Sequence, residues 1–307
     1  MVRSVTVSGL FVALLTPFDG EGNLDPTALD GLVEHTLRGG VDGVVALGTT
    51  GEFADLTPEE RLVVLETTVA AVGGRVPVIA GIGALGTAEA CRHAAVAEQA
   101  GADAVLSLPP LFWKLDDAEL FEHFAAVARA TQLPVLLYDI PIFAGASLSP
   151  ALVRRIAEEL PSVVGIKLTV TDFRSVSSIL TAVKPVRPDF SVTVGFEDLG
   201  LPALLAGADG LISGMANFDA PTLRTLVDAV AKDDLTAAAR AHAEVLRLFP
   251  VYFQANPPIL ALKALASALG VPLQPTVRSR HDPEVVRRVQ SWAAAALGTA
   301  GAHPVSS

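Results

Sequence analysis

Short apolar runs recur along the chain, and the segments between them are amphipathic. Eight runs of five to eight residues predict buried strands, while apolar residues spaced three and four apart predict helices between them. Eight strands alternating with helices indicate an α/β fold, a (β/α)8 TIM barrel, although an open doubly wound sheet would show the same alternation. The predicted strands are residues 9–16, 43–48, 76–82, 104–108, 134–139, 163–168, 191–195 and 210–214.

Two of the predicted helices begin at clear capping residues. Asp25 and Thr57 each stand before a proline, and this pair is typical of the first helical turn. The helices expected between the strands are residues 26–38, 58–72, 87–100, 117–130, 149–159, 172–184 and 198–206.

Three segments repeat one pattern, in which a helix ends at glycine and an aspartate precedes a short apolar strand. Their aspartates, Asp42, Asp103 and Asp209, are 61 and 106 residues apart. These spacings correspond to two and four units of about 25 to 32 residues each, as alternating strands and helices require. The segments are RGGVDGVVALG (38–48), QAGADAVLSLP (99–109) and LAGADGLISGM (205–215).

The strand count places the barrel within residues 1–219. The Ala-rich residues 220–297 have a helical pattern, and no linker precedes them. They are therefore expected to pack on the barrel as a C-terminal helical extension. The last residues, 298–307, are expected to form a disordered tail.

The composition excludes several classes of protein. Hydrophobic residues make up 51% of the 307 residues, and the formal net charge of −11 argues against nucleic acid or an anionic membrane as partner. No uninterrupted run of about 18 apolar residues predicts a transmembrane helix. Polar residues interrupt the apolar N-terminus, which fits a first strand better than a signal peptide, so a cytoplasmic protein is expected.

Neither the cysteine nor the histidines indicate a metal site. Cys91 is the single cysteine, which excludes an intramolecular disulfide, and the six histidines have no ligand spacing. Residues 81–86, GIGALG, match the dinucleotide fingerprint, whose acid should end the following strand. Here the acid, Asp103, precedes that strand, so no nucleotide site is expected.

Lys167 is the most unusual residue of the predicted strands. It lies in the apolar run PSVVGIKLTV (161–170), where a charged ammonium is costly unless it is paired or neutral. Lys167 and Tyr138 end consecutive strands, at the carboxyl face where barrels carry their active sites. A neutral amine is a nucleophile toward ketones, and a neighbouring tyrosine transfers protons. The alternative is a lysine whose stem is packed while its ammonium reaches water.

Two other strand ends carry polar groups. Residues 48–52, GTTGE, offer hydroxyls and turn N–H groups suited to a carboxylate or phosphate, or they form an ordinary capped turn. After the seventh strand, Glu197 and Asp198 either accept hydrogen bonds from substrate hydroxyls or cap the next helix.

The motifs Gly-Thr-Thr-Gly-Glu, Tyr-Asp-Ile-Pro and Gly-Ile-Lys, in this order, resemble the dihydrodipicolinate synthase and N-acetylneuraminate lyase family over residues 8–295. The resemblance implies a class I aldolase in which Lys167 forms an imine with C2 of pyruvate or another 2-keto acid, and Tyr138 shuttles protons. Thr49 and Thr50 then correspond to the hydroxyl pair used for proton relay and for the pyruvate carboxylate. The expected substrate-binding set is completed by Gly48, Thr169, Gly195, Glu197, Asp198 and Ser213. No metal or cofactor is implied, because the imine itself is the electron sink.

Departures from the synthases favour the sugar-acid branch of the family. Phe112 stands where a synthase tyrosine would reach the neighbouring subunit, and residues 142–145 are apolar where synthases carry a substrate-binding arginine. Thr169, two residues after the lysine, resembles the aldolases of 2-keto-3-deoxy sugar acids. Phe143 makes one side of the pocket less polar, which leaves an apolar or aromatic aldehyde open as a product.

The expected function is reversible cleavage of a 2-keto-3-deoxy sugar acid, or a related 2-keto acid, to pyruvate and an aldehyde. The alternatives are a dehydratase that uses the same imine, a 4-hydroxy-tetrahydrodipicolinate synthase, and a non-catalytic keto-acid-binding paralogue. The last is disfavoured because both the lysine and the tyrosine are present. By resemblance, the expected partners are the small-molecule substrate and further copies of the chain in a tetramer or dimer. Residues 111–113, Leu-Phe-Trp, fit a subunit interface, the pocket or the barrel rim.

Overall fold

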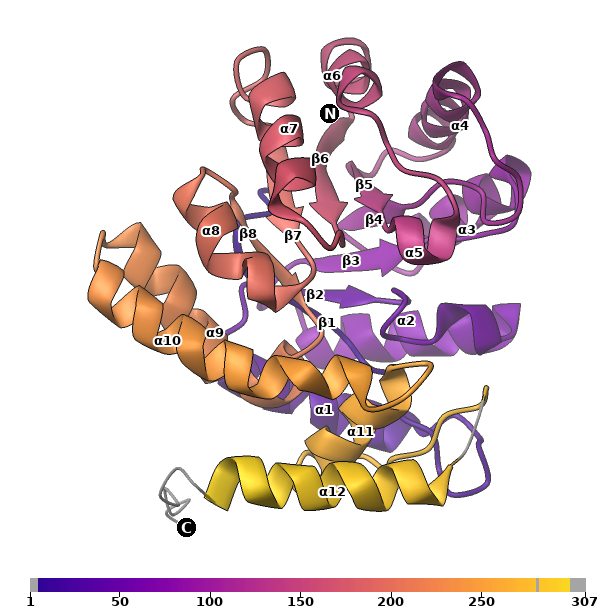
Figure 1. Cartoon of the computed structure of the whole chain (residues 1–307). Coiled ribbons are helices and arrows are strands. Elements are labelled where there is room, and N and C mark those ends of the chain that lie inside the picture. The colour runs from indigo at the N-terminus through magenta and orange to yellow at the C-terminus, as the bar shows by residue number, and fades with distance from the viewer. Residues whose placement is uncertain (1–4, 280–281, 299–307) are drawn as a thin grey trace.

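Eight parallel strands pair in chain order, and the last pairs with the first (Figure 1). The computed structural model describes residues 5–279 and 282–298, so the expected tail lies outside it except at Gly298, where the last helix ends. Closure confirms the predicted barrel and excludes the open sheet, which would leave two edge strands. The strands are β1 (Gly9–Ala13), β2 (Gly43–Ala46), β3 (Val78–Gly81), β4 (Ala104–Ser107), β5 (Val135–Asp139), β6 (Val163–Leu168), β7 (Ser191–Val194) and β8 (Gly210–Ser213).

The predicted strands overran the observed ones mainly at their carboxyl ends. Leu14 and Leu15 are buried and apolar, but they follow β1 and belong to the loops at the barrel mouth. The N–H of Leu15 bonds to the side chain of Asn217 rather than to a neighbouring strand. Apolarity alone therefore does not mark where a barrel strand ends.

The helices between the strands lie within one residue of their predicted bounds, except the last. Residues 198–206 form a 3-10 turn followed by a short helix, and two short elements, η1 and α5, were not predicted. The elements are α1 (Pro26–Arg38), η1 (Phe53–Asp55), α2 (Pro58–Val72), α3 (Thr87–Gln99), α4 (Asp117–Ala130), α5 (Pro141–Ala144), α6 (Pro150–Glu159), α7 (Phe173–Val183), η2 (Glu197–Leu199) and α8 (Gly200–Leu205).

Side-chain caps fix where several helices begin. The carboxylate of Asp25 accepts the N–H of Ala28 at the start of α1. Thr57 and Glu60 satisfy each other's backbone N–H groups at the start of α2. Each such cap stabilises a helix by about 1 kcal/mol, because it pairs N–H groups that have no partner within the helix.

The three repeated aspartates share one role at the amino end of the barrel. Asp42, Asp103 and Asp209 precede β2, β4 and β8. Their carboxylates accept, in that order, the N–H groups of Leu10, Val78 and Val192 at 2.7, 2.9 and 2.7 Å. The backbone N–H of each aspartate in turn donates to the carbonyl of the residue whose N–H its carboxylate accepts. Each aspartate therefore ties the start of its own strand to the start of the preceding one.

The elements after β8 are mostly helical and pack on the barrel. They are α9 (Ala216–Ala231), α10 (Leu235–Leu248), η3 (Phe249–Phe253), α11 (Ile259–Ala268) and α12 (Pro283–Gly298). α9 packs on β1 and β8, α10 packs on α9, and α11 lies against α12 (Figure 1). α9 passes through the expected barrel end at residue 219 and bends there, because Asp219 has non-helical φ and ψ of −138° and 44°.

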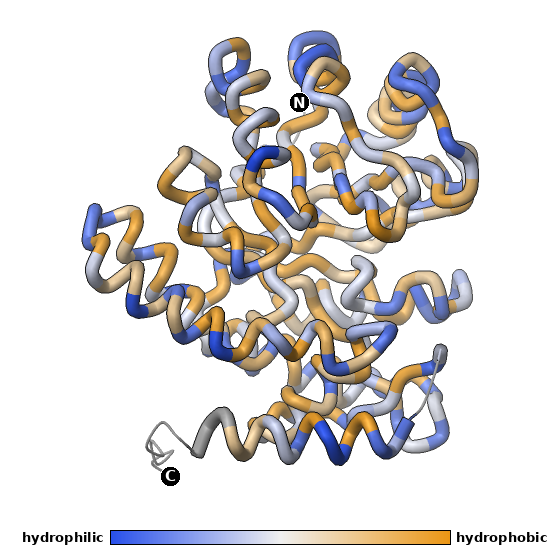
Figure 2. Tube along the Cα trace, viewed as in Figure 1, coloured by the Kyte–Doolittle hydropathy of each residue, from blue (hydrophilic) through white to orange (hydrophobic). Residues whose placement is uncertain are grey.

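The pattern of hydropathy follows this arrangement. The central strands are apolar, and α10 alternates between hydrophobic and hydrophilic residues along its length (Figure 2). Such alternation is typical of a helix with one face on the core and one in water. Among the described residues, no helix is both long enough and apolar enough to cross a bilayer.

The aspartate ties can be tested by substitution. Asp103→Ala is expected to lower the free energy of unfolding by about 1–3 kcal/mol, because the N–H of Val78 loses its acceptor. Asp189→Ala, at a position whose side chain is 79% exposed, is the control and is expected to change it by about 0.5 kcal/mol or less. Urea unfolding measures both, and equal effects would contradict the structural role of the repeated aspartates.

Candidate active site

The register of two strands places Lys167 beside Tyr138. β5 and β6 are parallel neighbours, and Tyr138 on β5 is paired with Lys167 on β6. The side chains of paired residues on parallel neighbours point to the same face of the sheet, and both side chains here line one cavity at the carboxyl face of the barrel. The tyrosine hydroxyl lies 3.5 Å from the lysine Nζ.

Lys167 is almost completely buried, at 4% exposure, and has no anionic partner. No carboxylate in the described part of the chain lies within ion-pairing distance of its Nζ, which instead sits 4.4 Å from the centre of the Tyr138 ring. A buried ammonium without a counter-charge is costly, whereas a neutral amine in the same place is not. The amine of Lys167 therefore lies at the cavity without an ion pair to any described carboxylate.

The turn after β2 brings two hydroxyls to the same place. The Oγ1 of Thr49 lies 3.4 Å from the hydroxyl of Tyr138, and Thr49 and Thr50 both line the cavity. Leu47 and Glu52, on either side of the turn, have φ of 58° and 53°, in the left-handed region that non-glycine residues rarely adopt. Such strained backbone is concentrated at functional sites, where the surrounding structure holds it in place.

The lack of a side chain at Gly195 leaves space for the side chain of Lys167. A Cβ at this position would lie 2.1 Å from the Oγ1 of Thr169 and 3.1 Å from the Cε of Lys167. Thr169 follows β6 directly, and its N–H bonds to the carbonyl of Asp139 at 2.8 Å. Its buried Oγ1 has no hydrogen-bond partner in the described structure. A hydroxyl left unpaired next to the amine is available to a substrate.

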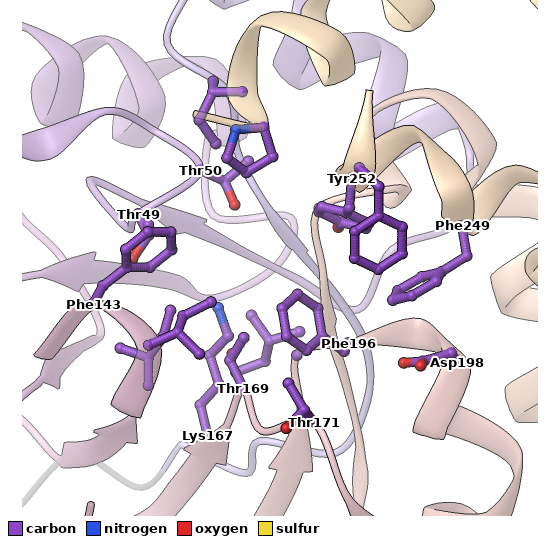
Figure 3. A pocket seen from close by; sticks show the side chains of 18 of the residues that line it. Thr49, Thr50, Phe143, Lys167, Thr169, Thr171, Phe196, Asp198, Phe249 and Tyr252 are labelled. Carbon is purple, nitrogen blue, oxygen red and sulfur yellow. The ribbon is translucent and has the colours of Figure 1, made fainter. Parts of the chain in front are cut away.

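The cavity has a volume of about 440 Å³ and opens above Lys167 (Figure 3). Most of the residues predicted from the sequence line it. These are Thr49, Thr50, Tyr138, Lys167, Thr169, Gly195 and Asp198. Three others, Gly48, Glu197 and Ser213, do not line it.

Glu197 lies behind the cavity wall in a hydrogen-bonded network. Its Oε1 accepts from the hydroxyl of Ser213 at 2.6 Å, from the N–H of Met215 at 3.0 Å and from the hydroxyl of Tyr252 at 3.0 Å. The residue is 1% exposed, and burial raises the pKa of its carboxyl. These contacts anchor η2 and η3 to the end of β8.

Tyr252 lines the cavity but was not predicted from the sequence. It belongs to η3 in the C-terminal extension, 55 residues from Glu197. The one available signal was the aromatic run LFPVYF (248–253), which is unusual in an otherwise Ala-rich region. Ile142 and Phe143, by contrast, line the cavity as apolar residues, as the sequence indicated. Phe112 and Trp113 do not line it and are 72% and 67% exposed.

The first two glycines of GIGALG, Gly81 and Gly83, allow close packing. A Cβ at Gly81 would lie 2.0 Å from the carbonyl oxygen of Leu47, and one at Gly83 would lie 2.7 Å from the ring of Phe53. Arg61 donates to the carbonyls of both glycines. Among the described residues there is also no cluster of three or more acidic, histidine or cysteine side chains placed to hold a metal ion.

A buried ion pair connects Glu52, at the end of the Thr49–Thr50 turn, to the C-terminal extension. Glu52, 6% exposed, lies 2.5 Å from the Nζ of Lys263, which is fully buried on α11. Burial raises the pKa of the Glu52 carboxyl and lowers the pKa of Lys263 to about 8, while their mutual attraction opposes both shifts. The lysine also donates to the carbonyl of Thr276 at 2.7 Å. The pair therefore joins the C-terminal extension to the turn.

Removing one member of this pair is expected to cost more than removing both. Lys263→Met should lower the free energy of unfolding by about 3–5 kcal/mol, because it leaves the Glu52 carboxylate buried without a partner. The double variant Glu52→Gln/Lys263→Met should regain a large part of that loss. Urea unfolding of the single and double variants measures this, and additive losses would contradict a coupled pair.

The comparisons with known proteins identify the family of the chain. Residues 6–285 match the model of the dihydrodipicolinate synthetase family. The chain is 35% identical over 268 residues to a probable 2-dehydro-3-deoxy-D-pentonate aldolase, YjhH, of Escherichia coli K12, covering 87% of this chain and 89% of the relative. It is also 35% identical to a 4-hydroxy-tetrahydrodipicolinate synthase of Bacillus subtilis over 253 residues, covering 82% and 86%.

A solved structure is similar throughout. It is that of YagE, a prophage protein of the dihydrodipicolinic acid synthase family from E. coli K12, in complex with pyruvate. Its TM-score is 0.91 at 30% identity, with 95% of this chain and 99% of that chain covered. The family resemblance seen in the sequence motifs is thus confirmed, and the chain is a lyase that belongs to the dihydrodipicolinate synthetase family.

Proposed function

We propose that the chain is a Schiff-base-forming lyase that cleaves a 2-keto-3-deoxy sugar acid, or a related 4-hydroxy-2-keto acid, reversibly to pyruvate and an aldehyde. The observation that carries the proposal is Lys167, which lines the cavity, is buried without an anionic partner among the described residues and lies 3.5 Å from the hydroxyl of Tyr138. The naming of YjhH and YagE as aldolases of 2-dehydro-3-deoxy acids supports it.

The reaction begins at the amine. The Nζ of Lys167 adds to the C2 carbonyl of the substrate, and loss of water gives a protonated imine. The proton of the C4 hydroxyl then leaves, and the C3–C4 electron pair passes into the imine, which releases the aldehyde and leaves an enamine. Protonation of the enamine at C3 and hydrolysis by water release pyruvate and restore the amine.

The surrounding groups are assigned to proton transfer and to binding. The hydroxyl of Tyr138 contacts both Lys167 Nζ and Thr49 Oγ1, so protons can pass along this line during imine formation and cleavage. Thr50 lines the same end of the cavity and is assigned to the carboxylate of the keto acid. The unpaired Oγ1 of Thr169 is assigned to the C4 hydroxyl.

The charges of the cavity argue against the synthase reaction. Apart from Lys167, none of the described side chains that line the cavity is cationic. The synthase substrate brings a second carboxylate, which would need a cationic or strongly donating partner when buried. Ile142 and Phe143 occupy the side on which synthases are expected to place an arginine. An aldehyde without a carboxylate fits this cavity better.

The proposal predicts release of pyruvate from 4-hydroxy-2-keto acids, including 2-keto-3-deoxygluconate and 2-keto-3-deoxypentonate. Tyr138→Phe should lower kcat by about a hundredfold or more, because the proton relay is lost. Thr193→Val is the control: Thr193 pairs with Lys167 on the neighbouring strand but does not line the cavity, and its loss should change kcat only a few-fold.

Two results would contradict the proposal. One is a product that keeps all carbons of the substrate and lacks one water, detected by mass spectrometry, which would indicate a dehydratase. The other is an unchanged kcat in Tyr138→Phe, which would remove the tyrosine from the assigned proton relay.

A further inference from the structure

The outer half of the cavity, the part farther from Lys167, is lined by residues from segments that follow the strands. Phe143 comes from α5, Phe196 from the loop after β7, and Phe249 and Tyr252 from η3 in the C-terminal extension. Figure 3 shows Phe143 on one side of the space above Lys167 and the other three rings on the opposite side. A substrate held on Lys167 by its C2 atom must place the carbons beyond C4 between these rings.

The wall opposite Phe143 is a packed aromatic cluster. The ring centres of Phe196 and Phe249 are 5.9 Å apart, those of Phe196 and Tyr252 5.7 Å, and those of Phe249 and Tyr252 5.2 Å. Distances and angles of this kind are typical of rings that hold one another in place. The wall is therefore both apolar and fixed.

The acid best placed to bind a chain of hydroxyls is turned away from the cavity. The Oε1 of Glu197 already accepts three hydrogen bonds, one of them from Tyr252, which lines the cavity where Glu197 does not. The hydroxyl proton of Tyr252 is donated to Glu197 and is not available to a ligand. Two groups that would otherwise hold a polyol are thus paired with each other.

Few polar groups remain in the outer half. Among the described residues that line it, they are Thr171, Asp198 and Asn256, in addition to the paired Tyr252. The half-buried carboxyl of Asp198 has one oxygen without a hydrogen-bond partner, and burial raises its pKa. Thr169, next to Lys167 across Gly195, serves the C4 hydroxyl. Among the described residues that line the cavity, apolar side chains outnumber these polar groups, so most of the outer surface suits an apolar group.

We infer that the preferred substrates are 4-hydroxy-2-keto acids whose C4 carries an alkyl or aryl group, so that the aldehyde released is apolar. This inference rests on the proposed function and narrows it within the class of 4-hydroxy-2-keto acids. Sugar acids share carbons C1 to C4 with these compounds and differ only beyond C4. Each hydroxyl buried between the rings without a partner lowers the rate of cleavage, while an apolar group there gains from leaving water.

A matched pair of substrates tests the inference. 2-Keto-3-deoxygluconate and 4-hydroxy-2-oxohexanoate have the same six-carbon chain, as their names state, and differ only in the hydroxyls at C5 and C6. The kcat/KM for pyruvate release should be about tenfold or more higher for the hexanoate, since each unpaired buried hydroxyl costs roughly that factor. 4-Hydroxy-2-oxo-4-phenylbutanoate should also be cleaved faster than the sugar acid.

A matched pair of variants tests the assigned residues. Phe143→Asn places an amide in the wall and should shift the ratio of the two kcat/KM values toward the sugar acid by several-fold. Phe173→Asn makes the same exchange at an exposed position on α7 that does not line the cavity, and should leave the ratio unchanged.

The outcomes separate this inference from the proposed function. Equal or faster cleavage of 2-keto-3-deoxygluconate, or an unchanged ratio in Phe143→Asn, would overturn the apolar preference and leave the lyase assignment in place. Pyruvate release from none of the three acids would overturn both.

Discussion

The parallel register of β5 and β6 is the constraint on which the chemistry of this protein depends. It sets Tyr138 and Lys167 side by side at the mouth of a closed barrel, with the hydroxyl 3.5 Å from the amine. The absence of a nearby carboxylate in the described structure is equally important, because no salt bridge competes with a ligand for this amine. Gly195 then leaves room for the lysine stem and for Thr169, and the turn after β2 adds the two threonine hydroxyls.

The barrel alone does not complete this site. The C-terminal extension reaches it at two points, through Lys263 against Glu52 below the threonine turn and through Tyr252 against Glu197 at the cavity wall. Both contacts bury an acid in the segment that follows a strand, Glu52 after β2 and Glu197 after β7. The extension therefore positions groups of the barrel and at the same time supplies two rings, Phe249 and Tyr252, of the aromatic wall of the cavity. Its packing links the stability of the fold to the shape of the pocket.

Much of the fold and part of the site follow from local sequence. Apolar runs and capping residues predict the strands and helices because their causes lie within a few residues, and the three repeated aspartates predict the spacing of the units. Lys167 stands out because a lysine in an apolar strand conflicts with its neighbours. The pairing of Glu52 with Lys263 and of Glu197 with Tyr252 joins residues far apart in the chain, and neither partner breaks a local pattern. Such contacts depend on how the extension packs on the barrel. No local sequence pattern predicts that packing.

The central claim is that Lys167, and not the equally buried Lys263, forms an imine with the keto acid. Borohydride reduction in the presence of pyruvate, followed by peptide mapping with mass spectrometry, tests it most directly. One reduced pyruvyl adduct is expected, on the peptide that contains Lys167, and none in Lys167→Ala. A protein that stays unmodified, or an adduct confined to Lys263 or another lysine, would contradict the account.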